Sequence, residues 1–207
     1  MKSAGRLGQV TTRLVANLAL ATCLLTACGA PQSPSPTSPT PTPDLAELRI
    51  QFDVPDCVAT DLAVEAIADG LPQTNLQCLG SDRRVNLAGL PRVPTIINVW
   101  AQWCGPCREE ASYLRDAAAS LDDVSFLGIN YNDPLPDWAL EFAGLANWGY
   151  PHVMDQDKLL QTELGIPGIP TTFFVAADGR VVGVHPGVLA SEQQLLDLAA
   201  EYLGVSP

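Results

Sequence analysis

Two cysteines, Cys104 and Cys107, stand where a strand-like run of residues passes into a helical one. Residues 95–101 are apolar and mostly β-branched, which is typical of a short strand buried on both faces. After Gly105, the apolar residues at positions 114, 117, 118 and 121 follow the spacing of a helix. This junction restricts the chain to folds in which strands and helices alternate.

The junction also predicts chemistry. Cys104 falls at the expected helix start, where free backbone N–H groups and the positive end of the helix dipole favour a thiolate, so its pKa should be lowered. Cys107, one turn further on, can reach back to the same sulfur and should be more buried. Pro106 is tolerated because the first helical turn has no N–H bond to lose. Gly105 leaves room for a partner chain to approach closely.

The segment after this helix predicts another strand and another helix. Residues 124–130 have the composition of a second buried strand, and Asp133-Pro134 is a plausible helix start. The apolar face predicted for that helix comprises Leu135, Trp138, Ala139, Phe142, Leu145 and Ala146. Residues 158–164 predict a further short helix.

A hairpin and a final helix complete the pattern. Residues 171–176 and 180–184 flank Asp178-Gly179, which is a strong turn signal. Ser191 and Gln194 form a capping box before the last apolar helical face. The order of all these elements predicts an α/β fold with a mixed central sheet and helices on both of its faces.

Residues before position 95 are less regular. Residues 75–79 and 83–87 predict a hairpin, and residues 44–69 are acidic, Ala-rich and expected to be partly helical. Cys57 and Cys78 lie in this part of the chain. In an oxidising compartment we expect them to form a structural disulfide. A redox relay to the other pair, or two unpaired thiols, are the alternatives.

The first 43 residues have the pattern of an export signal and a tether. Basic residues lead into an apolar stretch over residues 14–27, too short to span a bilayer comfortably, and we expect residues 1–27 to be a signal peptide. Leu25-Thr26-Ala27-Cys28 resembles a bacterial lipobox, which implies a lipid on Cys28. Residues 31–43 hold six prolines and six Ser or Thr, so residues 28–43 are expected to be an extended tether. The alternatives are an ordinary cleaved signal, with release of the protein, and an uncleaved anchor.

The charge excludes some partners. The chain has 11 basic and 23 acidic residues, a formal charge of −12. Three basic residues and no acid precede Cys28, so the chain from that residue carries 8 − 23 = −15. This excludes a nucleic-acid binder, which needs cationic surface, and a basic face for anionic lipid. Protein partners should instead present cationic or neutral docking surfaces.

Here the sequence resembles a known fold. Trp103-Cys104-Gly105-Pro106-Cys107 in this context is the signature of thioredoxins, and Cys107-Arg108-Glu109-Glu110 is similar to the C-(K/R)-x-E pattern of TlpA/ResA-type membrane-tethered thiol–disulfide oxidoreductases. Other matching segments are Tyr150-Pro151, residues 155–157, Gly168 to Thr171 and Asp178-Gly179-Arg180. The resemblance covers about residues 71–205. Ala111-Ser112 differs from the family pattern, because the family has a Pro close to this position. The difference affects what geometry we expect of the helix here.

The resemblance implies a thioredoxin fold over residues 71–207, with an inserted strand–helix segment and an N-terminal extension over residues 44–70. It implies that Pro170 is cis beside the sulfurs, and that the backbone of Ile169 pairs with an extended partner. Trp103 would shield the disulfide and shape the partner surface.

Glu110 matches a family glutamate near the cysteines. If burial raises its pKa, its carboxylate can take the proton of Cys107. Asn98 stands where thioredoxins themselves carry an acid and cannot accept that proton. The plain alternatives are a solvated charge at Glu110, a packing role for Trp103 and an ordinary turn at Pro170.

The expected activity is therefore extracytoplasmic dithiol–disulfide exchange at the outer face of a bacterial membrane. In the family the usual role is reduction, including that of apocytochrome cysteines, with electrons from a membrane thiol-transfer protein. The sulfurs carry the electrons, so no cofactor is expected. A metal is not expected either, because there is no second C-x-x-C, and His152 and His185 are not at ligand spacing. Competing interpretations are a disulfide-forming oxidase or isomerase, and a non-catalytic binding lipoprotein.

Overall fold

The computed structural model describes residues 44–207. The expected signal peptide over residues 1–27, the lipid on Cys28 and the tether up to residue 43 lie outside these residues. Between residues 44 and 207, none of the helices combines the length and the apolar character needed to cross a bilayer.

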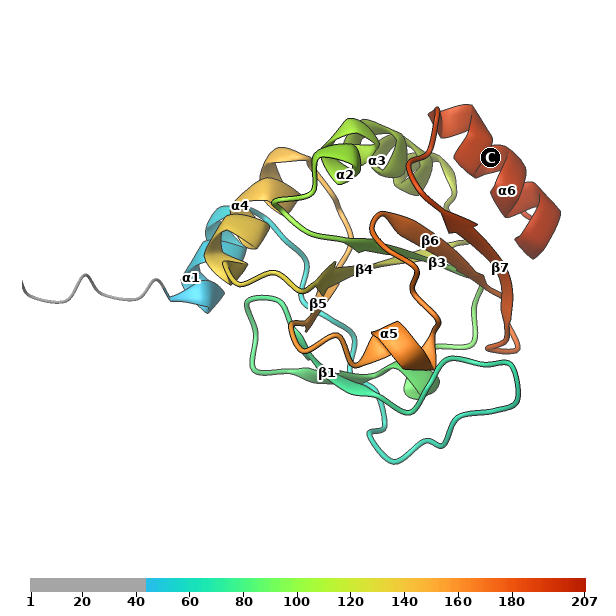
Figure 1. Ribbon diagram of the computed structural model, residues 1–207, viewed down its shortest axis with the longest axis horizontal. Coiled ribbons are helices and arrows are strands. Elements are labelled where there is room, and N and C mark those ends of the chain that lie inside the picture. The colour runs from blue at the N-terminus through green and yellow to red at the C-terminus, as the bar shows by residue number, and fades with distance from the viewer. Residues whose placement is uncertain (1–43) are drawn as a thin grey trace, which may run out of the picture. The chain divides into compact units, whose positions relative to one another are not determined.

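A mixed sheet forms the centre of the fold (Figure 1). Its strands are β1 (Asn75–Cys78), β2 (Arg84–Asn86), β3 (Thr95–Trp100), β4 (Ser125–Tyr131), β5 (His152–Asp155), β6 (Thr171–Val175) and β7 (Val181–Pro186). They lie in the order β2-β1-β5-β4-β3-β6-β7. The pairs β3–β4 and β4–β5 are parallel, and the other pairs are antiparallel. The expected mixed α/β sheet is confirmed.

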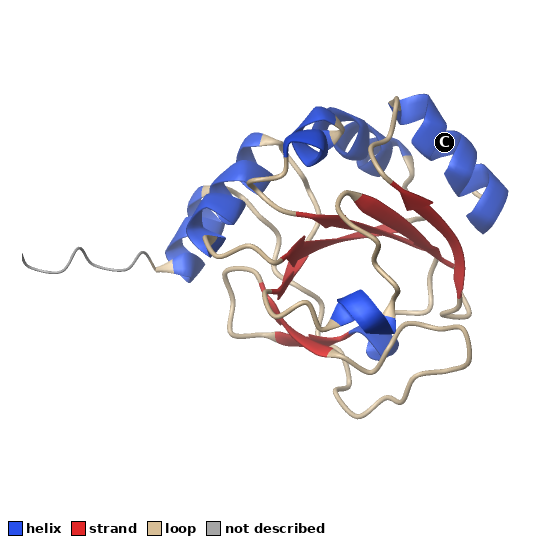
Figure 2. Cartoon of the chain, in the orientation of Figure 1, coloured by secondary structure: helices blue, strands red, loops and turns tan. Residues whose placement is uncertain are grey.

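Helices cover the two faces of the sheet unequally (Figure 2). They are α1 (Leu45–Gln51), α2 (Gly105–Glu109), α3 (Ala111–Ser120), α4 (Pro136–Leu145), α5 (Leu160–Glu163) and α6 (Glu192–Leu203), with a 3₁₀ turn at Leu87–Gly89. Helices α1, α2, α3, α4 and α6 lie on one face, and short α5 lies on the other. Alternate residues of β3 face opposite sides of the sheet. Ile96 and Trp100 pack in the core under the helices, whereas Ile97 and Val99 pack with Leu160 in the core on the other face.

The helix that carries the cysteines is broken. It divides at Glu110 into α2 and α3, at the position next to the departure from the family pattern. Leu114 and Ala117 of α3 are fully buried, as the apolar stripe predicts. At α6, Ser191 Oγ accepts a hydrogen bond from Gln194 N at 3.1 Å, so the predicted cap is confirmed.

The predicted helix start at Asp133-Pro134 is wrong, and so is much of the predicted apolar face. Helix α4 begins at Pro136, because the Asp133 carboxylate accepts a hydrogen bond from Leu135 N and another from a distant backbone group. The residues that pack inward are Ala139, Leu140 and Ala143, while Leu135, Trp138 and Leu145 are exposed. Phe142 and Ala146 are partly buried and pack against the same core, so this part of the predicted face is confirmed.

Strand β5 was not apparent from the residue pattern alone. Its four residues begin with His152 and end with Asp155, so they offer no alternation of apolar and polar side chains. Gly128 of β4 pairs with His152, and a Cβ at Gly128 would clash with the imidazole. Trp100 Nε1 donates to His152 Nδ1 at 3.2 Å. Complete burial lowers the pKa of His152 from 6.5 to about 3, so the imidazole is neutral.

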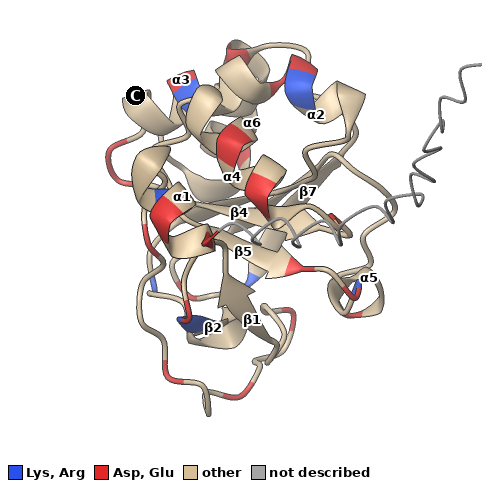
Figure 3. Ribbon diagram, turned by 90° about the vertical axis from the view of Figure 1, so that its left-hand side faces the viewer, with Lys and Arg blue, Asp and Glu red and all other residues tan. Residues whose placement is uncertain are grey.

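The N-terminal extension is anchored by α1 and by a disulfide, among other contacts. Asp44 caps α1, which packs against α4 on the face shown in Figure 3. The following segment reaches Cys57, which forms a disulfide with Cys78 at the end of β1. The expected bridge is thus present, and it joins the extension to the predicted hairpin of β1 and β2. Of residues 52–69, none is helical, so the helical prediction holds only for α1.

Removal of this bridge should destabilise the protein without stopping catalysis. In the double variant Cys57→Ala/Cys78→Ala, the unfolded chain regains the freedom of a loop that spans 21 residues, which costs roughly 3 kcal/mol of stability in the chain-entropy model. Urea unfolding of the oxidised proteins measures this difference. If the folded variant loses turnover in a disulfide-reduction assay, the relay interpretation of Cys57 and Cys78 is favoured over the structural one.

Candidate active site

Cys104 and Cys107 form a disulfide at the N-terminus of α2. Cys104 is the N-cap residue, and its Sγ accepts a hydrogen bond from Cys107 N at 3.2 Å. Cys104 is 3% exposed and Cys107 is 0% exposed, the order expected from the sequence. Because Pro106 occupies the first turn and brings no N–H, the Cys107 N–H is directed at the sulfur. A thiolate at Cys104 would meet this donor and the positive end of the helix dipole.

The loop before Cys104 is held by a carboxylate that sequence analysis assigned to a helix start. Asp133, only 1% exposed, accepts hydrogen bonds from Gln102 N at 2.8 Å and Asn130 Nδ2 at 2.9 Å. Trp103 Nε1 donates to Asn132 O at 3.1 Å. The loops after β3 and β4 are therefore bonded to each other. Since parallel strands place their carboxyl ends at one edge of the sheet, parallel β3–β4 pairing was the signal that could have found Asp133.

The other wall of the site is the loop before β6. The Ile169–Pro170 peptide bond is cis, as the resemblance implies. Thr171 pairs with Val99 near the end of β3, which places the cis peptide beside the strand that leads to Cys104. Pro170 O accepts a hydrogen bond from Gly187 N at 2.9 Å. Pro170 is buried and Ile169 is half-buried.

Glu110 is fully buried one turn after Cys107, so the solvated-charge alternative is wrong. Its Oε1 accepts a hydrogen bond from Asn98 Nδ2 at 2.9 Å, and its Oε2 accepts one from Leu189 N at 2.8 Å. Burial raises the pKa of Glu110 from 4.5 to about 7, although the two hydrogen bonds oppose that rise. A carboxyl group with this pKa exchanges its proton near neutral pH.

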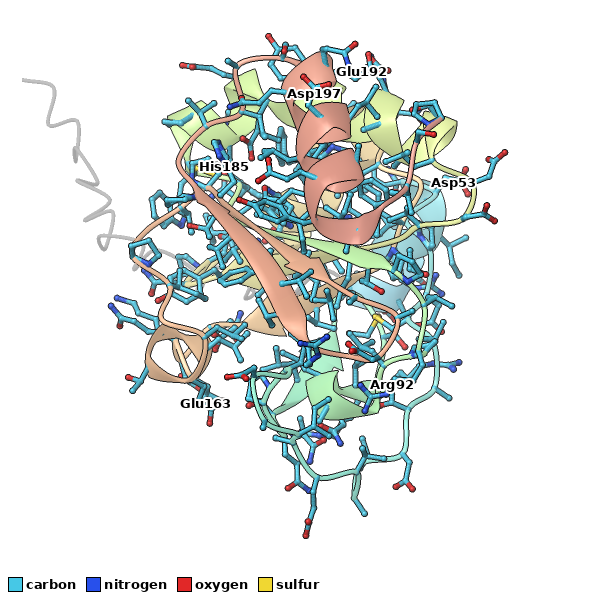
Figure 4. All side chains as sticks on the ribbon, turned by 90° about the vertical axis from the view of Figure 1, so that its right-hand side faces the viewer. Asp53, Arg92, Glu163, His185, Glu192 and Asp197 are labelled. Carbon is cyan, nitrogen blue, oxygen red and sulfur yellow. A yellow bond between two sulfur atoms is a disulfide. The ribbon has the colours of Figure 1, made fainter. Side chains whose placement is uncertain are left out.

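A polar row crosses the sheet beside Glu110. Asn98 of β3 pairs with Thr172 of β6, which pairs with His185 of β7, so the three side chains lie on one face. His185 is therefore a half-buried strand residue of the hairpin, as expected (Figure 4).

The burial of Tyr150 and the nearby Glu110 carboxylate both raise the pKa of the Tyr150 hydroxyl, which stays neutral. Neither the polar row nor the role of the Leu189 backbone N–H was apparent from the sequence.

No metal site is assembled by the cysteines within residues 44–207. The one group of side chains close enough to share an ion there is Asp56, Cys57 and Cys78. The two sulfurs of that group are bonded to each other, so neither is available as a thiolate ligand.

Gly105 has open space around it, which separates its effect on folding from its effect on partners. A Cβ at Gly105 would meet no atom within 4 Å. We expect Gly105→Ala to change the free energy of unfolding by less than about 1 kcal/mol. It should raise the KM for a protein disulfide while leaving turnover of a small disulfide unchanged. Urea unfolding and steady-state kinetics check these two expectations. If wild type and Gly105→Ala had equal KM values for the protein substrate, the open space at Gly105 would not be needed for partner binding.

A thioredoxin-like fold that presents a Cys-x-x-Cys disulfide at a helix N-terminus defines a thiol–disulfide oxidoreductase. Residues 66–199 match the Redoxin family, and the chain belongs to this family. It is 34% identical over 145 residues to the thiol:disulfide interchange protein DsbE of Pseudomonas fluorescens biotype C, which covers 69% of this chain and 79% of that protein.

Two further similarities agree with this assignment. The thiol:disulfide interchange protein HelX of Rhodobacter capsulatus is 30% identical over 147 residues, which covers 69% of this chain and 78% of HelX. The crystal structure of a secreted thiol-disulfide isomerase from Corynebacterium glutamicum superposes with a TM-score of 0.58 at 27% identity. That match covers 64% of this chain and 84% of the isomerase.

Proposed function

We propose that this chain is an extracytoplasmic, lipid-tethered oxidoreductase that reduces disulfides of exported proteins, with apocytochrome cysteines among its substrates. The observation that carries the proposal is the Cys104 sulfur at the start of α2, facing the Cys107 N–H, with the buried Glu110 carboxyl one turn beyond. This arrangement supplies both a nucleophile and a proton acceptor. The relatives DsbE and HelX, both named as interchange proteins, support the same chemistry.

The reaction has two steps. The Cys104 thiolate attacks a partner disulfide, forming a mixed disulfide and releasing the second partner sulfur as a thiolate. Cys107 then passes its proton to the Glu110 carboxylate and attacks Cys104 Sγ. The bond between Cys104 and Cys107 forms, and the partner's remaining sulfur leaves as a thiolate, so two electrons have moved to the partner. A membrane thiol-transfer protein would reduce the pair again.

Trp103, Gly105, Pro106, Ile169 and Pro170 form the partner-binding rim in this proposal. Trp103 is half exposed next to Cys104, and the cis Ile169–Pro170 bond directly precedes β6, whose first residue pairs near the C-terminal end of β3. The half-buried Ile169 offers its backbone to an extended partner segment, which would pair with it as an added strand does.

The tether rests on the sequence alone. The lipobox at Cys28 and the Pro-rich segment after it support attachment to the outer face of the membrane. Treatment of cells with a labelled lipid precursor tests this directly. We expect label on the wild type and none on Cys28→Ala. If neither protein were labelled, the lipid attachment would be contradicted and the protein would be a secreted one.

The opposite direction is the second candidate, because the superposed relative from Corynebacterium glutamicum is named as an isomerase. The reduction potential of the Cys104–Cys107 pair separates the two. A value near that of thioredoxin, about −270 mV, is expected for a reductant, and a value above about −180 mV would assign an oxidase or isomerase. Equilibration of residues 44–207 with glutathione, followed by alkylation and mass spectrometry, gives this potential.

A further inference from the structure

Helix α4 carries large apolar side chains on its outer surface. Trp138 is 57% exposed and Leu145 is 74% exposed, and Leu135 precedes the helix at 39%. The inward residues Ala139 and Leu140 are fully buried, so the helix is already anchored without the outer ones. Exposed apolar side chains that gather at one place mark interaction sites more often than scattered ones do.

These side chains continue the surface of the redox loop. One hollow is lined by Trp103 and Leu135, and a second is lined by Trp138, Phe142 and Leu145. Gln102, which directly precedes Trp103, lines both hollows. We name Leu135, Trp138, Glu141 and Leu145 the α4 strip. It therefore starts at the loop that holds Cys104 and leads away from it.

The strip is acidic. Helix α4 contains Asp137 and Glu141 and no basic residue. Neighbouring α1 carries Glu47 and Arg49, and the ribbon in Figure 3 marks acidic positions of both helices on this face. The cation in the second hollow is Arg108, whose Nε donates to Gln102 O at 2.8 Å and whose guanidinium lies 4.7 Å from the centre of the Phe142 ring. Its hydrogen bond is thus directed into the protein, and the acids remain free for a partner.

We propose that the α4 strip binds the stretch of partner polypeptide next to the reacting cysteine, and that this stretch is extended, apolar and basic. The inference rests on the proposed function, since it assumes that Cys104 reacts with a protein. From Leu135 to Leu145 the strip is about 15 Å long at ~1.5 Å per residue, which an extended chain covers with about five residues at ~3.3 Å each. Apolar side chains enter the two hollows, and basic ones pair with Asp137 and Glu141.

The test compares peptide and small disulfides in steady-state kinetics. The first probe is a ten-residue peptide in which Leu and Lys follow a cysteine, and this cysteine carries a mixed disulfide to a chromogenic thiol. The second probe is the same peptide with Glu in place of Lys. The third probe is hydroxyethyl disulfide. The variants are Trp138→Ser and Glu141→Gln. The controls are Leu62→Ser, an exposed apolar residue of the loop over residues 53–74, and Glu201→Gln on α6.

Trp138→Ser is expected to raise the KM for the Lys peptide about tenfold, the effect of losing one aromatic anchor, with kcat unchanged. Glu141→Gln should raise that KM about threefold and abolish the preference over the Glu peptide, because one charge pair is lost. Both variants should reduce hydroxyethyl disulfide as the wild type does. The two controls should change none of these values.

Equal KM values for wild type and Trp138→Ser, or preference of the wild type for the Glu peptide, would overturn the docking proposal while leaving the redox function intact. The docking proposal would also be overturned if the variants lost as much activity with hydroxyethyl disulfide as with the peptide, because that result would indicate damage to the cysteine loop. Binding of wild type but not Trp138→Ser to phosphatidylcholine vesicles would assign the strip to lipid instead. A wild type that reduces none of the probes would contradict the proposed function itself.

Discussion

Cys107→Ala is expected to abolish repeated turnover and to leave a stable mixed disulfide on Cys104. Attack by Cys104 needs only its own sulfur at the start of α2, whereas resolution needs the second sulfur that lies against it. Without Cys107, the mixed disulfide can be released only by an external thiol. The rate of insulin reduction should fall more than about a thousandfold, as for loss of a covalent nucleophile. Non-reducing electrophoresis and mass spectrometry then identify the trapped partner.

Cys104→Ser is the matched control, since it removes the attacking sulfur and keeps Cys107. Cys107 is fully buried, so it should trap no partner in this variant. If Cys104→Ser reduced insulin as fast as the wild type, the chain would not act through this pair. If it trapped partners as well as Cys107→Ala does, the two sulfurs would have exchanged roles.

The second large effect is on stability, and it concerns Glu110. Its pKa is about 7 in the folded protein and 4.5 in an unfolded chain. Between these values the folded state holds a proton that the unfolded state has lost, so this group makes the protein less stable as the pH rises. The full change corresponds to about 3 kcal/mol. Glu110→Gln removes it, and the amide can still accept the hydrogen bond from Leu189 N.

His152 opposes this trend, which makes a comparison of variants necessary. Its pKa of about 3 lies below the ordinary 6.5, so the unfolded state binds more protons and the protein loses stability as the pH falls from 6.5 toward 3. Between pH 4.5 and 6.5 the contributions of Glu110 and His152 have opposite signs. The wild type should therefore show a flatter pH profile than Glu110→Gln.

Urea unfolding of both proteins at pH 4.5, 5.5, 6.5 and 8 isolates the effect of Glu110, because all other groups cancel in the difference. The stability of Glu110→Gln relative to the wild type should increase by about 3 kcal/mol across this range, with most of the change below pH 7. Glu201→Gln, on the exposed surface of α6, should show no such change. A constant difference for Glu110→Gln would mean that its carboxyl is not desolvated.

Several features of the site could be predicted because they depend on neighbours in sequence. The position of Cys104 at a helix start follows from the strand-like run before it and from Pro106 after it. The family resemblance, not periodicity, implied that Pro170 is cis and that Glu110 lies near the cysteines. The hairpin of β6 and β7 followed from Asp178-Gly179, whose turn geometry is local.

Other features needed contacts between distant segments. Asp133 was expected to start a helix, but it holds the Cys104 loop because β3 and β4 are parallel neighbours. The N–H that binds Glu110 belongs to Leu189, 79 residues away. The predicted apolar face of α4 was wrong in part, since Trp138 and Ala139 both fit a helical stripe and only packing decides which side turns inward.

By itself, the sequence determined the chemistry of this protein: a reactive sulfur at a helix start, a second sulfur one turn on, and an alternation of strands and helices around them. These depend on hydrogen bonds and dipoles within a few residues. Only the tertiary structure decided the environment of that chemistry. The desolvation of Glu110 and the outward turn of Trp138 arise from segments that are remote in the chain, because burial depends on what the rest of the fold places against a side chain.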